Sequence, residues 1–239
     1  MDDRPALWAY QKLRAAGMET IDLVTSASLA RAKSWELRLG QSGSQLELAL
    51  DDGRRFRSSS IRGVLNRLVC APDGIVQHAV AEDRDYAAAE LMAFYLGWLS
   101  ILRGVINAPT PQGLCGSWRH ASEWCVLAAR AGFAVPHFRQ TSLEPMADGF
   151  RSLAPTGTPM QSVIVLRDEL YGATVPAHIG AACRRLAVLA DIELLGVDLF
   201  ESEEGDLTFA HATPFPDLTA GGDAFIGGLA RALDAPPAG

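Results

Sequence analysis

The feature that most constrains this chain is the apolar stretch of residues 83–104, DRDYAAAELMAFYLGWLSILRG. Asp83 or Asp85 can cap a helix there, because a carboxylate accepts hydrogen bonds from the free N–H groups of a first turn. Two rows of side chains follow at helical spacing, Tyr86, Glu90, Phe94, Trp98 and Leu102 in the first and Leu91, Tyr95 and Leu99 in the second. Since apolar residues occupy most sides, we predict a helix that is buried between layers.

Apolar alternation and helical spacing predict further elements on both sides of this helix. They are paired strands within 35–57 around an Asp-Gly turn, a strand over 61–69, a helix over 118–132 capped by Ser117 and ended by Gly132, two strands within 162–175, a helix over 177–192, a hairpin over 194–218 and a helix over 221–235. The order lacks the regular spacing of a doubly wound parallel sheet. We therefore predict an α+β protein with mixed sheets and packed helices, divided into domains 1–108 and 109–239.

Charge and hydropathy exclude several classes of protein. The 21 basic and 28 acidic residues give a net charge of -7 without a long basic run, so no nucleic-acid partner is expected. The most apolar run, residues 91–106, is interrupted by Ser100 and Arg103 and is shorter than the ~20 residues of a spanning helix. The chain starts with acidic residues where a secretion signal needs positive charge. We expect a cytoplasmic protein without a membrane segment.

Polar residues at the ends of apolar elements are candidates for ligand contact. Asn66, Arg67 and Arg103 hold such positions, from which they could reach a carboxylate ligand. Arg119 lies beside the predicted helix start, where backbone N–H groups could bind an anion; a plain capped helix is the alternative.

The four cysteines show no C-x-x-C spacing. Reduced thiols are therefore expected rather than disulfides or zinc ligands. Cys115 has no base that the sequence indicates, so we predict a loop thiol and not a nucleophile.

The hairpin LLGVDLFESEEGDLTFAHATPFPDL, residues 194–218, brings a carboxylate and an imidazole together. If the chain reverses near Glu203, Asp198 and His211 lie opposite each other on neighbouring strands, within reach of one ion. Two ligands are too few for a zinc site. An Asp–His hydrogen bond is thus the alternative to a transition-metal site.

The order of these segments resembles the ATP-grasp superfamily. The matching pieces are IRGVLNRL, YAAAELMAFYLGWL, VINAPTPQGLCGSW, ASEWCVLAARAGFAVPHF, VIVLRDELYGATVP and LLGVDLF. The resemblance is closest to the glutamate-ligase-like branch that includes the peptide-macrocyclising ligases. It implies a pre-ATP-grasp-like N-terminal domain over 1–108 and an ATP-grasp-like domain over 109–239. Members of the superfamily join a carboxylic acid to an amine through an acyl phosphate, using ATP and magnesium.

Against that family, the nucleotide-binding part of the chain is short. A small domain that supplies lysines and a glycine-rich loop is expected where this chain has only residues 139–162, which contain no lysine. The two lysines of the chain, Lys12 and Lys33, lie far from that position. The resemblance thus implies an ATP-grasp-like core that lacks most of the central nucleotide-binding subdomain.

The magnesium site of the family is only partly present. Asp198 matches its first acidic position, but His211 stands where the family has glutamate and Thr213 where it has asparagine. Magnesium prefers oxygen ligands, for which imidazole is a poor substitute. The resemblance therefore implies a decayed magnesium site.

These observations predict a degenerate, non-catalytic ATP-grasp-like protein that binds a peptide, a small carboxylate or a partner protein, without a cofactor. One alternative is a carboxylate–amine ligase that uses ATP and magnesium with the help of a partner subunit. Another is a metal-dependent enzyme that uses Asp198 and His211. The sequence leaves the oligomeric state open.

Overall fold

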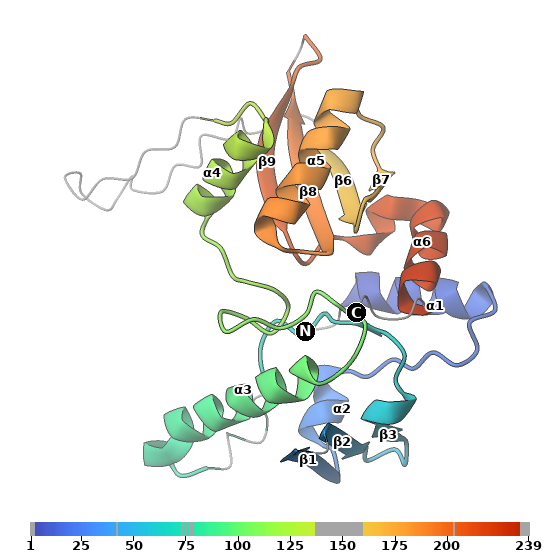
Figure 1. The fold of residues 1–239 in the computed structure, drawn as a ribbon, viewed down its shortest axis with the longest axis vertical. Coiled ribbons are helices and arrows are strands. Elements are labelled where there is room, and N and C mark those ends of the chain that lie inside the picture. The colour runs from blue at the N-terminus through green and yellow to red at the C-terminus, as the bar shows by residue number, and fades with distance from the viewer. Residues whose placement is uncertain are drawn as a thin grey trace. The chain divides into compact units, whose positions relative to one another are not determined.

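The computed structural model describes residues 3–41, 43–72, 74, 76, 79–136, 160–202 and 204–234 (Figure 1). The chain forms two compact units. Unit 1 contains Met1–Trp118 and Ile226–Gly239, and unit 2 contains Arg119–Phe225. Our predicted division at 108/109 thus falls inside unit 1, and the end of the chain returns to that unit.

Unit 1 combines helices with two small sheets. Its elements are α1 (Arg4–Ala15), α2 (Ser26–Ala30), the antiparallel sheet of β1 (Ser34–Gly40), β2 (Gly43–Ala49) and β3 (Arg55–Arg57), the 3-10 turns Ser58–Ser60 and Ala81–Asp83, α3 (Arg84–Ser100), the parallel pair β4 (Val64–Leu65) and β5 (Val105–Ile106), and most of α6 (Gly222–Asp234). Gly63 lies directly against the backbone of Leu233, so a side chain has no room there.

The helix α3 is exposed at its start and becomes buried toward its end. Leu91, Tyr95 and Leu99 lie in the core of unit 1 together with Leu46 and Leu48 of β2. By contrast, Tyr86 is 70% exposed. The prediction of burial between layers is therefore wrong for the first turns of the helix, where Tyr86 and Glu90 are exposed. It is confirmed further along the same row, where Trp98 and Leu102 lie in this core.

The predicted strand over 61–69 is reduced to β4. The side chain of Asn66 ends it, because its Oδ1 accepts a hydrogen bond from the backbone N–H of Leu68 at 3.1 Å. Such a bond to the residue two positions ahead turns the chain and competes with strand pairing.

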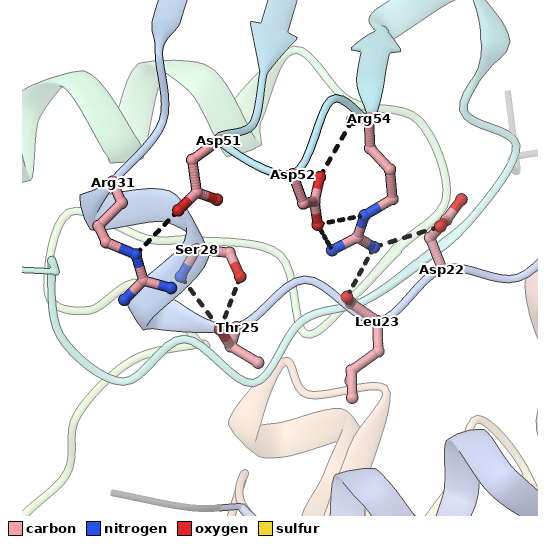
Figure 2. A network of polar contacts seen from close by, with 8 residues as sticks. All are labelled: Asp22, Leu23, Thr25, Ser28, Arg31, Asp51, Asp52 and Arg54. Atoms are coloured by element: carbon pink, nitrogen blue, oxygen red, sulfur yellow. Dashed lines mark hydrogen bonds and ion pairs between the residues drawn. The ribbon is translucent and has the colours of Figure 1, made fainter.

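An exposed polar network ties the segment between α1 and α2 to the turn between β2 and β3. Figure 2 shows its residues, Asp22, Leu23, Thr25, Ser28, Arg31, Asp51, Asp52 and Arg54. The guanidinium of Arg54 donates to the carboxylate of Asp52 and to the carbonyl of Leu23, and it approaches Asp22 at 3.3 Å. One side chain thereby holds an irregular segment against the hairpin.

Unit 2 is one antiparallel sheet with two helices on one face (Figure 1). Its elements are α4 (Ala121–Ala131), β6 (Met160–Leu166), β7 (Glu169–Gly172), α5 (Ala177–Ala190), β8 (Leu194–Glu201), β9 (Leu207–Thr213) and the 3-10 turn Leu218–Gly221, with strand order β7-β6-β8-β9. The predicted inner face of α5, with Ile179, Cys183, Leu186 and Ala190, is confirmed as buried.

The start of α4 differs from the prediction. His120, not Ser117, caps the helix: its Nδ1 accepts from the N–H of Ser122, and Glu123 accepts from the N–H of His120. The Ser117 hydroxyl instead donates to Thr110. The predicted end is confirmed, because Gly132 adopts the left-handed conformation with φ of 99° that suits glycine.

The predicted α+β class, with mixed sheets and packed helices, is confirmed. Most of the segment in which the sequence predicts a missing nucleotide-binding subdomain, residues 137–159, lies outside the described residues. Among the described helices, none combines the length and the apolar character that a membrane crossing requires.

A buried ion pair joins α1 to the residues after β4. Nε of Arg67 lies 2.6 Å from Oδ2 of Asp3, and Nη2 lies 3.2 Å from Oδ1, which makes the pair bidentate. The Arg67 side chain is only 7% exposed. Asp3 also caps α1 by accepting from the N–H of Ala6.

We expect Asp3→Asn to destabilise the protein by about 3 kcal/mol, because it leaves a buried guanidinium without its countercharge. Asparagine keeps the ability to cap the helix, so the variant tests the charge alone. Urea unfolding followed by tryptophan fluorescence measures the effect.

The matched control is Asp51→Asn. Asp51 pairs with Arg31 at 2.9 Å, but both side chains are well exposed, so the loss should stay within about 1 kcal/mol. Equal losses for the two variants would contradict a special role for the Asp3–Arg67 pair.

Candidate functional site

Three polar side chains lie side by side across the sheet of unit 2. Ser162 of β6 is paired with Asp198 of β8, and Asp198 is paired with His211 of β9. We call these three residues the polar row. The predicted opposition of Asp198 and His211 is confirmed by this register. The place of Ser162 was missed, because it precedes a continuous apolar run, Val163–Leu166, in which no alternation marks one face of the strand.

The polar row occupies the face of the sheet opposite α4 and α5. Val163, Val197 and Ala212 belong to the core beneath α4 and α5. Because successive side chains of a strand point to opposite faces, their neighbours Ser162, Asp198 and His211 point the other way. The alternation that builds the core therefore also positions the row.

Within the row, Asp198 accepts a hydrogen bond from Ser162 but none from His211. The Ser162 hydroxyl donates to Oδ1 of Asp198 at 2.6 Å, a short distance that is typical of a bond to a carboxylate. Ser162 and Asp198 are half-buried, whereas His211 is exposed. A register shift follows Asp198 between β8 and β9. Among the described residues, no hydrogen bond joins the imidazole to the carboxylate.

The rest of this face is covered by the chain after β9. Gly196 lies so close to Pro216 that a Cβ would approach the proline Cβ to 2.8 Å. Thr213, opposite Gly196, accepts the N–H of Phe215 through its hydroxyl oxygen at 3.1 Å. The Thr213 hydroxyl thus forms a local turn, while the polar row remains at the uncovered end.

The order of groups in the row differs from that of a serine–histidine–acid triad. In that triad the serine passes its proton to a histidine, which an acid group orients from the far side. Here the carboxylate lies between the two, and Ser162 donates to Asp198 instead. The arrangement can bind N–H and O–H groups of a ligand.

The row also does not suit magnesium. Magnesium takes six oxygen ligands, usually one or two carboxylates together with waters or substrate phosphates. The row offers it a single carboxylate, already bonded by Ser162, beside an imidazole. Within the described part of the chain, no cluster of three or more His, Cys, Asp or Glu residues could hold a metal ion.

Several arginines of unit 2 donate hydrogen bonds to backbone carbonyls. Arg119 donates to Ala190 at 2.9 Å, Arg184 to Asp168 at 2.6 Å and Arg185 to Ala131 at 2.8 Å. Ala190 and Ala131 end helices, where a cation is favoured by the helix dipole. The guanidinium of Arg119 also lies 5.8 Å from the centre of the Trp124 ring. Its predicted contact with a ligand stays a prediction.

In unit 1, two of the predicted ligand residues are bonded inside the protein. The Asn66 side chain donates to the carbonyls of Asn107 at 2.9 Å and of Leu114 at 2.6 Å, and Arg67 pairs with Asp3. Arg103 is exposed. Its predicted contact with a carboxylate stays a prediction.

Cys115 lies beside Asn66 and has the properties of a structural thiol. It is buried and donates to the Asn66 carbonyl at 3.1 Å. Burial raises the pKa of the Cys115 thiol to about 11, so it stays protonated and poorly nucleophilic at neutral pH. This agrees with the prediction of a loop thiol, and none of the four cysteines, which all lie within the described residues, forms a disulfide.

Comparisons with known proteins identify the fold. No family model and no curated protein matches the sequence. A RiPP-associated ATP-grasp ligase from Chryseobacterium gregarium, in complex with ADP and a leader and core peptide, matches with a TM-score of 0.66 and 13% identity, over 96% of this chain and 93% of that chain. Macrocyclase MdnB from Microcystis aeruginosa MRC matches with a TM-score of 0.64 and 12% identity, over 98% and 95%.

ATP-grasp ligase PsnB, complexed with a phosphomimetic variant of minimal precursor, Mg and ADP, matches with a TM-score of 0.62 and 17% identity, over 97% of this chain and 94% of that chain. At such identities the likeness concerns the fold. The chain therefore has the fold of the peptide-macrocyclising ATP-grasp ligases, as the resemblance in the sequence implies.

We expect His211→Glu to create a site for a divalent cation in the polar row. The new carboxylate would lie opposite Asp198, and two carboxylates on one face supply the oxygen ligands that hard cations need. Binding of Mn²⁺ or Mg²⁺ should appear in calorimetric titrations with a dissociation constant on the order of 1 mM.

The matched control is His178→Glu, the same change at an exposed position of α5. Equal cation binding by this control, or by the natural chain, would contradict the role of His211 in excluding the ion.

Proposed function

We propose that this chain is an ATP-grasp-like protein that binds a peptide and does not itself phosphorylate a carboxylic acid. The observation that carries the proposal is the composition of the polar row, in which one carboxylate is flanked by a hydroxyl and an imidazole. The row keeps the means to bind a polar ligand without the oxygen donors that magnesium needs.

The absence of lysine from unit 2 supports the second half of the proposal. Residues 119–225 contain none, because the lysines of the chain are Lys12 and Lys33. Phosphoryl transfer depends on cations that stabilise the charge developing on the phosphate oxygens. The arginines of this stretch could supply charge, but three of the described ones, Arg119, Arg184 and Arg185, each donate to a backbone carbonyl. The proposal therefore includes no nucleotide or magnesium cofactor.

The fold supports the peptide as ligand. The Chryseobacterium gregarium ligase was solved with a leader and core peptide, and macrocyclase MdnC with precursor peptide MdnA. A peptide presents backbone N–H groups and side-chain donors that Asp198 can accept, since Ser162 uses one of its oxygens and leaves the other. His211, exposed beside it, can donate to a carbonyl or accept from an N–H.

We expect ATP neither to stabilise this protein nor to be hydrolysed by it. ATP with magnesium should leave the melting temperature of the purified protein unchanged and should release no ADP, because no clamp for a triphosphate forms. Differential scanning fluorimetry and a coupled ADP assay measure both. Thermal stabilisation or steady ADP release by the chain alone would overturn the non-catalytic half of the proposal and favour the ligase alternative.

For the peptide, we expect a displayed library of random linear peptides to yield binders. Asp198→Asn should weaken the best of them about tenfold or more, because it removes a charged acceptor. Fluorescence anisotropy with the synthetic peptide measures the change. Asp206→Asn, at an exposed position in the turn between β8 and β9, is the control. Failure to select any binder, or equal binding by Asp198→Asn, would contradict peptide binding at the row.

A further inference from the structure

The strand β1 presents an open edge in unit 1. It is the outer strand of the sheet, and among the described residues only β2 pairs with it (Figure 1). Six of its seven residues are exposed. Leu39 is 70% exposed and Trp35 41%. Long, exposed apolar edge strands are templates for pairing with another strand.

The backbone direction of β1 shows which groups face outward. On β2, Leu46 donates its N–H to Ser58 and Leu50 donates to Arg54, so these residues point their backbone groups away from β1. In an antiparallel pair this direction alternates along the strand. The partners of Leu46 and Leu48, which are Leu37 and Trp35, therefore direct their N–H and C=O groups to the free edge, as does Leu39.

One face of β1 carries apolar side chains and the other carries charged ones. Trp35 and Leu37 lie on the side of α3: the Trp35 ring centroid is 4.1 Å from that of Phe94, and Leu37 lies against Gly97. The opposite face carries Glu36 and Arg38.

The exposed charges form a short series across the strands. Arg38 binds Glu36 in bidentate fashion, with Nε 2.8 Å and Nη2 3.0 Å from its oxygens. Glu36 is also paired with Glu47, which binds Arg57 at 3.3 Å. Glu36 therefore has a like charge on its inner side, so a second cation on its outer side would be favourable.

We propose that β1 pairs with β1 of a second copy of this chain, antiparallel about Leu37, to form one continuous sheet. The stretch Trp35-Glu36-Leu37-Arg38-Leu39 is complementary to itself in this register. Glu36 lies opposite Arg38 of the copy, and Trp35 opposite Leu39. Because Trp35, Leu37 and Leu39 all direct their backbone groups outward, each of their pairings can exchange both hydrogen bonds.

The neighbouring registers are disfavoured. A strand can slip only by steps that keep the outward backbone groups paired. A slip one way places Glu36 opposite Glu36 of the copy, and a slip the other way places Arg38 opposite Arg38. Like charges directly opposite each other destabilise a pair. The register about Leu37 therefore matches every charge with its opposite, which points to a second copy as the occupant rather than an arbitrary peptide.

The test uses two charge reversals that each break self-pairing and that restore it together. We expect the natural chain to show a concentration-dependent dimer in sedimentation equilibrium. Glu36→Arg and Arg38→Glu should each raise the dimer dissociation constant about tenfold or more, since both cross-strand pairs become repulsive. The double variant E36R with R38E should dimerise like the natural chain.

Mixing the two single variants sharpens the test, because E36R opposes R38E with matched charges at every position. The mixture should form a heterodimer that neither protein forms with itself. Arg55→Glu, an exposed reversal on β3, should leave the natural dimer unchanged.

All altered side chains are well exposed, and circular dichroism verifies the fold of each variant. A natural chain that stays monomeric would overturn the proposal and leave the edge available to an extended peptide. A dimer that both single reversals leave intact, or a mixture that does not pair, would also overturn it.

Discussion

The register of β8 between β6 and β9 is the constraint on which the proposed site depends. It directs Val197 into the core beneath the helices and Asp198 to the opposite face. A slip of one residue would exchange these faces, burying a carboxylate and exposing a valine, and the cost of that exchange fixes the register. Ser162 and His211 lie beside Asp198 for the same reason. Hydrophobic burial on one face therefore determines the polar chemistry of the other.

In unit 1, burying a polar side chain without a hydrogen-bond partner would also cost free energy. A guanidinium as buried as that of Arg67 requires an acceptor, and Asp3, distant in sequence, supplies it. Asn66 likewise uses its amide for the carbonyls of Asn107 and Leu114. Polar residues at the ends of apolar elements are thus explained here by the loops that they hold, and a ligand is not needed to account for them.

The sequence predicts what local periodicity determines. The inner face of α5 and the opposition of Asp198 and His211 follow from spacing of 3.6 and 2.0 residues. Prediction from the sequence fails where two residues fit the same local role and only tertiary contacts determine which of them takes it. Ser117 could cap α4 as well as His120 does, but its hydroxyl donates to Thr110 instead. The partner of Asp198, Ser162, comes from a strand far away in the chain, and no local pattern specifies that pairing.

Unit 1 is assembled from two separated parts of the chain, Met1–Trp118 and the part that begins at Ile226. The contact of Gly63 with the Leu233 backbone shows how closely the late part fits the early one. During synthesis on the ribosome, all of the contiguous unit 2 is made before the last segment of unit 1. Nascent unit 1 therefore stays incomplete until its closing residues have been added.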